Sequence, residues 1–260
     1  AVRSVEHMAT TASPLLGESH ATDRPKNWQE AKEHGYQVKQ YSTEEEGKKA
    51  RKDFLIKVYS LLAAQLTLTF LVVLVFLYVE PVTMFTVMNM WVFFLFMILW
   101  IISLVALMVF KNQYPANIIL LGTFTLLASV TMGCTAAVYS SSGRGEIVLV
   151  AFGITLFVFV GLTLFAALSE IDFSFLAYFL VAALLVLILF MLTSILFGFR
   201  LGWLFASLGV LVFAGFILYD TDQIMNHMGL DDHVIANIEL YLDFLNMFSF
   251  ILMCFGGDIG

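Results

Sequence analysis

Long apolar runs separated by short polar breaks make up the chain from Phe54 onward. Each run is about as long as the ~20 residues that an α-helix needs to cross the hydrocarbon core of a bilayer. The seven runs lie at residues 54–79, 87–110, 116–139, 147–168, 175–197, 203–225 and 234–255. Inside a bilayer each run must satisfy its own backbone hydrogen bonds, which a helix does. The pattern predicts an all-α polytopic membrane protein whose transmembrane domain, residues 54–260, is a bundle of seven helices.

The first 53 residues differ from the rest of the chain. They are polar, contain nine acidic and nine basic residues, and show no sustained apolar period. A segment of this composition does not bury enough apolar surface to fold alone. We therefore expect residues 1–53 to form a disordered or weakly helical tail in the cytosol.

Basic residues near the ends of the predicted helices indicate how the bundle is oriented. If the amino terminus is cytosolic, six of them lie on the cytosolic side and two on the opposite side. The six are Lys48, Lys49, Arg51, Lys52, Lys57 and Lys111, and the two are Arg144 and Arg200. This asymmetry follows the positive-inside rule and predicts a cytosolic amino terminus. Because the last run contains acidic residues, a six-span alternative with a re-entrant last segment stays open.

Composition and charge narrow the class of protein. Hydrophobic residues make up 60% and charged residues 13% of the chain, about half the ~25% charged residues of a typical soluble domain. Residues 1–200 contain 13 acidic and 13 basic residues, so the net charge of −7 comes from residues 201–260, which contain seven acidic residues and no Lys or Arg. The chain has no basic face, which disfavours nucleic acid as a partner.

Two carboxylates are predicted inside the membrane, where ionisable groups are costly and often functional. Asp220 lies near the end of the sixth run, and Asp243 lies nine residues into the seventh. Because consecutive helices are antiparallel, both acids fall in the cytosolic half of the bundle. Two carboxylates in a site of low dielectric constant can share a proton, whose loss replaces a hydrogen bond by repulsion. The pair is therefore a candidate pH-sensing gate and a transient oxygen site for Ca²⁺.

Neighbouring polar residues extend this hypothesis. Glu239 lies one helical turn before Asp243 and Asn246 three residues after it, on the same helix face. Together with Asp222, they are candidates for a cation path. A structural reading stays equally open, in which Asp220 or Asp222 caps the segment after the sixth helix.

Several motifs resemble those of a known family. They are RKDFLIKVYSLLAAQLTLT (51–69), the short turn EPVTMF (80–85), DFSFL (172–176), GFILYDTDQIM (215–225) and IELYLDFLNMF (238–248). The chain resembles the transmembrane Bax-inhibitor-motif family, in its lifeguard and Golgi anti-apoptotic branch, over nearly all of residues 51–253. The resemblance implies a seven-helix bundle with the last helix central, and a protein that is not an enzyme.

The resemblance also implies a function. Members of the family form a pH-sensitive Ca²⁺ leak from intracellular stores and suppress cell death. We therefore expect a protein of the endoplasmic reticulum, Golgi or vacuolar membrane, with Ca²⁺ as the permeant ion and no tightly bound cofactor. Its expected partners are the lipid bilayer and cell-death regulators of the Bcl-2 type.

The same resemblance assigns residues. The paired aspartates of the family map onto Asp220 and Asp243. Bacterial relatives have an arginine near this pair, at the end of the second helix, where this chain has Lys111 followed by Asn112 and Gln113. We expect Lys111 to serve as the counter-charge, although an ammonium lacks the planar fork of a guanidinium.

Two other classes of function compete with the channel. A non-conducting scaffold that regulates apoptosis through its helix faces would tolerate neutral replacement of both aspartates. An intramembrane aspartyl protease pairs Tyr-Asp on one helix with Gly-x-Gly-Asp on the next, which Tyr219-Asp220 and Gly256-Gly257-Asp258 match in part. The protease is disfavoured, because Asp258 is expected beyond the bilayer, on the side opposite Asp220.

Glycines inside the predicted helices suggest where helices approach each other closely. Gly153 and Gly161 fall in the fourth run, and Gly209 and Gly215 in the sixth. Small residues at helix contacts let the backbones come together in membranes. We therefore predict that all four glycines lie at close helix contacts.

Overall fold

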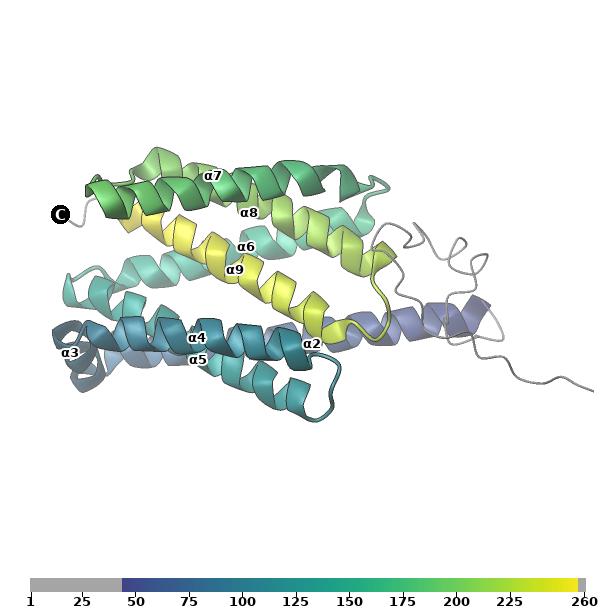
Figure 1. The fold of residues 1–260 in the computed structure, drawn as a ribbon, viewed down its shortest axis with the longest axis horizontal. Helices are drawn as coiled ribbons and strands as arrows, with labels where there is room; N and C mark the ends of the chain where they lie inside the picture. Colours follow the sequence, from purple (N-terminus) through teal and green to yellow (C-terminus); the bar gives the residue numbers. More distant parts are fainter. Residues whose placement is uncertain (1–43, 257–260) are drawn as a thin grey trace, which may run out of the picture. The chain divides into compact units, whose positions relative to one another are not determined.

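Helices account for nearly all of the part of the chain that the computed structural model describes, residues 44–256 (Figure 1). The α-helices are α2 (Glu44–Tyr78), α3 (Glu80–Met88), α4 (Trp91–Phe110), α5 (Ala116–Ser141), α6 (Gly145–Leu168), α7 (Leu176–Phe197), α8 (Trp203–Asp222) and α9 (His233–Gly256). Two short elements join them: the 3₁₀ turn η1 (Phe173–Phe175) precedes α7, and the π-helical turn η2 (Gln223–His227) follows α8. Residues 44–256 contain no β-strand.

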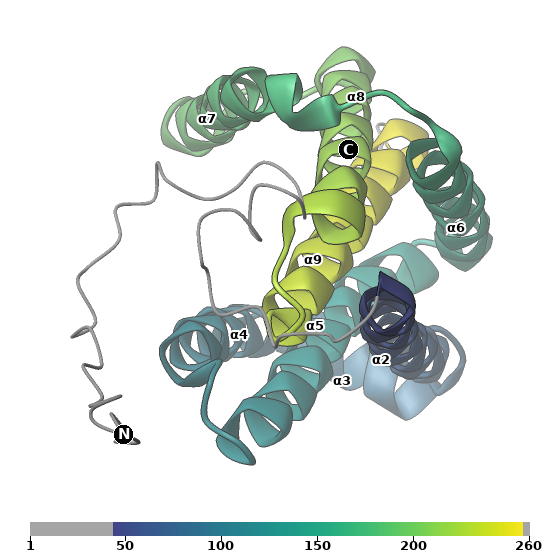
Figure 2. The ribbon, with the colours of Figure 1, turned by 90° about the vertical axis from the view of Figure 1, so that its right-hand side faces the viewer.

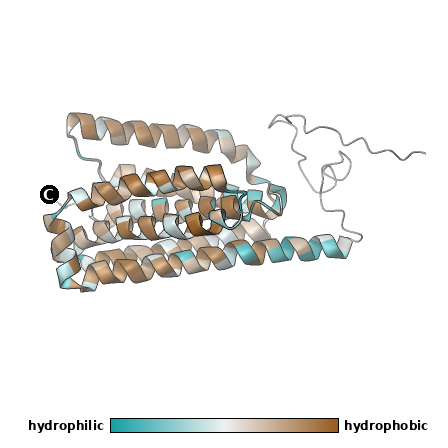
Figure 3. Ribbon diagram, turned by 60° about the horizontal axis from the view of Figure 1, so that its bottom comes forward, coloured by the Kyte–Doolittle hydropathy of each residue, from teal (hydrophilic) through white to brown (hydrophobic). Residues whose placement is uncertain are grey.

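Seven helices are long and apolar enough to cross a membrane. They follow the seven predicted runs in order, and even the shortest, α4, has 20 residues, a length of ~30 Å that matches the hydrocarbon core. Figure 3 shows hydrophobic residues along the length of the helices. The predicted all-α architecture with seven candidate spans is therefore confirmed. Because α9 is a continuous helix of 24 residues, the structure favours seven spans over six.

Helix α3 replaces the short turn predicted at residues 80–85. Pro81 lies in its first turn, where a missing N–H is tolerated, and Glu80 places a negative charge at the positive end of the helix. The hydroxyl of Thr83 donates a hydrogen bond to the backbone oxygen of Phe76 at 2.7 Å, which ties α3 to the end of α2. With nine residues, α3 is roughly 14 Å long and too short to cross a bilayer.

Helix α2 begins earlier than the first apolar run. It starts at Glu44, so residues 44–53, predicted as part of the polar tail, form its first turns. Its 35 residues span roughly 52 Å, well beyond the ~30 Å hydrocarbon core. Hydrophilic residues gather at this amino-terminal end (Figure 3). The rest of the predicted tail, residues 1–43, lies outside the described residues.

Helix α9 packs against four others: α2, α5, α6 and α8. In Figures 1 and 2 it runs between α4 and α5 on one side and α7 and α8 on the other. More than half of its most apolar stretch is buried, the largest share among the seven spans. Its Phe244 and Phe248 both contact Phe152 of α6 edge-on, with ring centroids 5.3 and 5.8 Å apart. Polar residues carried by α9 are therefore placed in the interior of the bundle.

A seam of buried polar side chains joins α2, α5 and α9. The hydroxyl of Thr69 in α2 lies 2.8 Å from that of Tyr241 in α9 and 3.0 Å from that of Ser129 in α5. One turn away, the amide nitrogen of Gln65 donates to the hydroxyl of Thr125 at 2.6 Å. Hydrogen bonds between transmembrane helices contribute about 0.6–2 kcal/mol each. These hydrogen bonds hold α9 against α2 and α5, through the side of α9 that faces away from α7 and α8.

The four glycines predicted at helix contacts fall into two groups. In α8, a Cβ added to Gly209 would overlap the ring of Phe250 in α9, and one added to Gly215 would collide with a side chain of α7. The prediction is confirmed for this pair. A Cβ added to Gly153 or Gly161 in α6 would have nothing within 4 Å, so the prediction is wrong for them.

Substitution at these glycines separates close packing from helix propensity. Gly209→Ala is expected to lower stability by about 1–3 kcal/mol, because the new methyl group must push α8 and α9 apart. Gly153→Ala is the matched control and should be neutral or slightly stabilising, since alanine favours the helix by up to ~1 kcal/mol. The measurement is the midpoint of thermal unfolding in detergent. Equal effects of the two substitutions would contradict the close α8–α9 contact.

Candidate functional site

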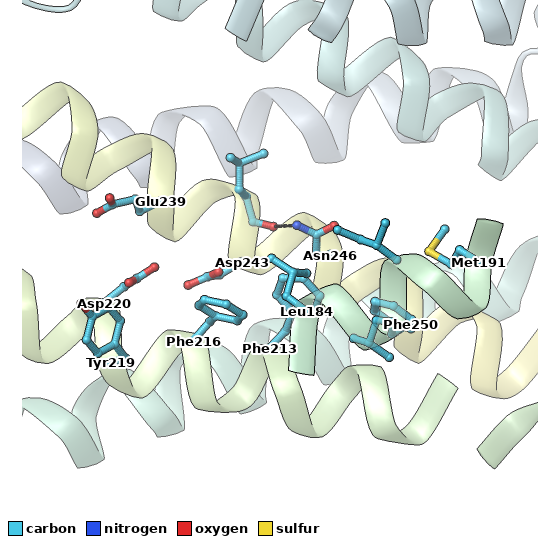
Figure 4. A pocket seen from close by; sticks show the side chains of 13 residues that line it. Leu184, Met191, Phe213, Phe216, Tyr219, Asp220, Glu239, Asp243, Asn246 and Phe250 are labelled. Atoms are coloured by element: carbon cyan, nitrogen blue, oxygen red, sulfur yellow. Dashed lines mark hydrogen bonds between the residues drawn. The ribbon is translucent and has the colours of Figure 1, made fainter. Parts of the chain in front are cut away.

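A cavity of about 510 Å³ lies between α7, α8 and α9 (Figure 4). Each helix contributes residues at helical spacing, so that one face of each points into the same space. The lining residues are Leu184, Leu187, Ile188, Met191, Phe213, Phe216, Tyr219, Asp220, Glu239, Leu242, Asp243, Asn246 and Phe250. None of these described lining residues is Lys, Arg or His. The cavity is therefore apolar along most of its wall and acidic at one part of it.

The two aspartates predicted as a pair meet in this cavity. Asp220 of α8 and Asp243 of α9 are only 8% and 5% exposed. Their carboxyl groups point toward each other in Figure 4, close enough for a hydrogen bond when one of them is protonated. Oδ2 of Asp243 is buried and has no hydrogen-bond partner. A buried acceptor without a partner is costly, so this oxygen is available to a proton or a ligand.

Two of the other candidates also line the cavity. Glu239 lies one turn from Asp243 on α9, and its buried Oε2 has no hydrogen-bond partner. The amide nitrogen of Asn246 donates to the backbone oxygen of Leu242 at 2.8 Å. The amide oxygen of Asn246 is then the atom left for another partner. The spacing of these residues along α9 predicted their common face, and the structure shows that this face borders the cavity.

Asp222 has a different role from Asp220, although only one residue separates them. Two residues along an α-helix turn the side chain by roughly 200°, and Asp222 does not line the cavity. Its Oδ2 accepts a hydrogen bond from the backbone N–H of Phe173 at 3.0 Å, and its Oδ1 accepts one from the amide of Asn226 at 2.7 Å. The predicted cap on the segment after α8 is wrong for Asp222, which precedes η2 without a side-chain hydrogen bond to its backbone. Its structural role is instead to bind the turn before α7 and the side chain of Asn226, and it is not one of the residues that line the cavity.

The turn before α7 is held to the end of α8 by further bonds. The amide of Gln223 donates to the hydroxyl of Ser174 at 3.0 Å. Asp172, just outside the membrane-spanning part of α7, accepts a hydrogen bond from the N–H of Ser174 at 2.8 Å. Hydrogen bonds from Ser174 lower the pKa of the Asp172 carboxyl. Together with Asp222, these contacts fix the α7 wall of the cavity relative to α8.

Two remaining predictions concern a metal-ion site and Asp258. Within residues 44–256 there is no group of three or more His, Cys, Asp or Glu side chains that could hold a metal ion. Asp258, the second aspartate of the protease alternative, lies outside the described residues.

Comparison with known proteins identifies the family. The family described as "Inhibitor of apoptosis-promoting Bax1" matches residues 51–258, most of the chain. The chain belongs to the Bax inhibitor family. The family resemblance predicted from the motifs is confirmed.

Relatives in plants, fungi and animals match over most of the chain. Protein LIFEGUARD 1 of Arabidopsis thaliana is 34% identical over 220 residues, covering 82% of this chain and 92% of the relative. Bax inhibitor 1 of Schizosaccharomyces pombe is 38% identical over 215 residues, covering 80% and 78%. Protein lifeguard 3 of Homo sapiens is 29% identical over 221 residues, covering 80% and 70%.

The basic residue expected beside the aspartates of this Bax inhibitor family member is not part of the cavity. Lys111 follows the last residue of α4, and its backbone oxygen accepts a hydrogen bond from the amide of Asn117 at 3.0 Å. Lys111 is absent from the lining residues. Its assignment as the counter-charge of the pair stays a prediction.

Arg51 makes the basic contact that sequence reasoning missed. From α2 it donates hydrogen bonds to the backbone oxygens of Met225 at 3.0 Å and Met228 at 2.6 Å. Its guanidinium also lies 5.3 Å from the ring centroid of Phe54. These bonds satisfy carbonyl groups at the carboxyl end of α8 and η2, where the helix dipole favours a cation. The one available signal was that Arg51 is the single arginine in the basic cluster at residues 48–57.

The hydrogen bonds of Asp222 lead to a stability prediction. Asp222→Ala is expected to lower stability by about 1–3 kcal/mol, because it leaves the buried N–H of Phe173 without an acceptor. Asp222→Asn should cost less, since the amide oxygen can still accept that bond. The measurement is thermal unfolding in detergent, with the exposed Glu170→Gln as the control. If Asp222→Ala unfolds like the wild type, Asp222 does not anchor the turn before α7.

Proposed function

We propose that this Bax inhibitor family member forms a Ca²⁺ leak in an intracellular membrane, gated by protonation of the Asp220–Asp243 pair. One observation carries the proposal: two facing, nearly buried carboxylates border a cavity that lies within candidate membrane spans and has no basic residue among its described lining residues. Glu239 and Asn246 add oxygens along the same wall. Carboxylate and amide oxygens are the ligands that Ca²⁺ prefers.

The gate works through the charge of the pair. When one carboxyl group holds a proton, it can donate a hydrogen bond to the other and join α8 to α9. When the proton leaves, two like charges face each other at low dielectric constant and repel. The charged and titratable groups around the pair are Glu239 on α9, Tyr219 on α8 and, more distantly, Lys111 after α4, whereas the residues of α7 that line the cavity are all apolar. A cation that enters between the carboxylates would replace the lost proton.

The proposed orientation makes the gate respond to cytosolic pH. Arg51 belongs to the basic cluster that the positive-inside rule assigns to the cytosol. Its hydrogen bonds to Met225 and Met228 place the end of α8, and therefore Asp220, at the same end of the bundle. The lumen of the endoplasmic reticulum, Golgi or vacuole then supplies the Ca²⁺.

Ca²⁺ flux from reconstituted vesicles tests this function. We expect the wild-type protein to release trapped Ca²⁺ slowly at acidic pH and faster at alkaline pH, with protein-free vesicles as the control. A leak that lowers store Ca²⁺ would link the protein to the suppression of cell death, with Bcl-2-type regulators as partners. Folded protein that conducts no Ca²⁺ at any pH would contradict the channel and favour a non-conducting scaffold.

A further inference from the structure

The cavity between α7, α8 and α9 has two ends of different chemistry. Figure 4 shows Glu239, Asp220 and Asp243 toward one end and Met191 and Phe250 toward the other. Phe250 lies eleven positions after Glu239 on α9, which corresponds to roughly 16 Å of helix. A volume of about 510 Å³ falls within the ~300–1,000 Å³ of small-molecule sites. The space therefore suits an elongated ligand with a polar head and an apolar tail.

The α7 wall gives such a ligand a way in from the lipid. Helix α7 has the smallest buried share of the seven spans. It packs mainly on α8 and η1, whereas α9 packs on α2, α5, α6 and α8. Ile188 and Met191 line the cavity and are also 42% and 47% exposed. The apolar part of the cavity is thus bordered by side chains that also face the hydrocarbon region.

The acidic end selects the head group. The Asp243 carboxyl is 5% exposed, points into the cavity and has an oxygen without a hydrogen-bond partner. Asp220 and Glu239 add negative charge close by, and no described lining residue is basic. An anionic head would be buried without a counter-charge, which is strongly unfavourable. An ammonium offers three donors and a positive charge, and the rings of Phe216 and Tyr219 in the lining add a surface that favours cations.

We propose that this cavity binds a single-chain amphiphilic amine, with its ammonium group between Asp220 and Asp243, near Glu239, and its aliphatic chain running along α7 toward Phe250. The amine reaches the site from the bilayer. Bound there, it supplies the donors that Oδ2 of Asp243 lacks and fills the space between α7 and α9. It would also block the cation path, and this consequence alone rests on the proposed function.

Equilibrium binding of radiolabelled dodecylamine to the full chain in nanodiscs tests the inference, with binding to empty nanodiscs subtracted. We expect saturable binding that excess unlabelled dodecylamine displaces, and that dodecanol and dodecanoate displace at least about tenfold less well. Asp243→Asn should weaken binding about tenfold or more, since it removes the charge that pairs with the ammonium. Saturable binding that dodecanol displaces equally well, or that Asp243→Asn leaves unchanged, would overturn the proposal.

A second pair of variants tests where the aliphatic chain of the amine binds, without changing the carboxylates. Met191→Trp adds bulk to the apolar end of the cavity and should weaken dodecylamine binding several-fold. Leu192→Trp is the matched control, because Leu192 is similarly exposed on α7 and does not line the cavity. Equal affinities of the two variants would place the amine elsewhere.

The amine site and the proposed function can fail independently, because binding is measured without flux. Saturable binding with no Ca²⁺ leak contradicts only the proposed function. A pH-gated leak with no saturable binding contradicts only the amine site.

Discussion

Asp243→Asn is expected to abolish the pH dependence of Ca²⁺ flux and leave the leak near its acidic, closed level. The new amide can donate a hydrogen bond to Asp220 at every pH, so α8 and α9 stay joined. As an order of magnitude, two like unit charges about 4 Å apart at an effective dielectric constant of ~20 repel by about 4 kcal/mol. A bias of about 1.4 kcal/mol already shifts an equilibrium tenfold. The measurement is the ratio of flux at alkaline pH to flux at acidic pH, about tenfold or more for the wild type and close to one for the variant.

The coupling between Asp220 and Asp243 leads to a more specific prediction. Asp220→Asn should flatten the profile in the same way, and the double variant should add nothing, because both substitutions remove one coupled interaction. Glu170→Gln is the control, since Glu170 is exposed and lies outside the cavity. A wild-type profile in either single variant, from protein with a normal unfolding midpoint, would show that the pair does not set the pH response.

Arg51→Ala is expected to have the largest effect on stability. It removes two hydrogen bonds from a charged donor to the oxygens of Met225 and Met228. Such bonds contribute about 1.5–3 kcal/mol each, and their partial exposure reduces the expected total to about 2–4 kcal/mol. Arg51→Lys should recover about half, because an ammonium cannot reproduce the fork that spans both oxygens. Thermal unfolding reports the global loss.

Hydrogen exchange distinguishes this role from a general loss of stability. Relative to the wild type, Arg51→Ala should increase the exchange rate of the η2 amides, at residues 223–227, more than that of the amides in the middle of α5. Lys52→Ala is the matched control, because Lys52 is the exposed neighbour of Arg51 on α2. If Lys52→Ala destabilises as much as Arg51→Ala, the effect comes from the charge of the cluster and not from the bonds to η2.

The seven spans could be predicted from the amino-acid sequence alone, because a bilayer requires long apolar segments that satisfy their own hydrogen bonds. The sequence also predicted that Glu239, Asp243 and Asn246 share a face, since helical spacing is a local property. It did not show that Asp222 lies outside the cavity that Asp220 lines, because two acids two positions apart differ only in the direction that each faces within the packed bundle.

Contacts between residues far apart in the sequence depend on how the helices pack. Arg51 lies more than 170 positions from the oxygens that it binds, and no local pattern encodes such a contact. Packing also placed Gly209 against Phe250 and left Gly153 without a close neighbour. In each case the role of a residue depends on which helix lies opposite it. Hydropathy shows that a segment is a membrane helix but not which face meets which partner, and that pairing arises only when all the helices pack together.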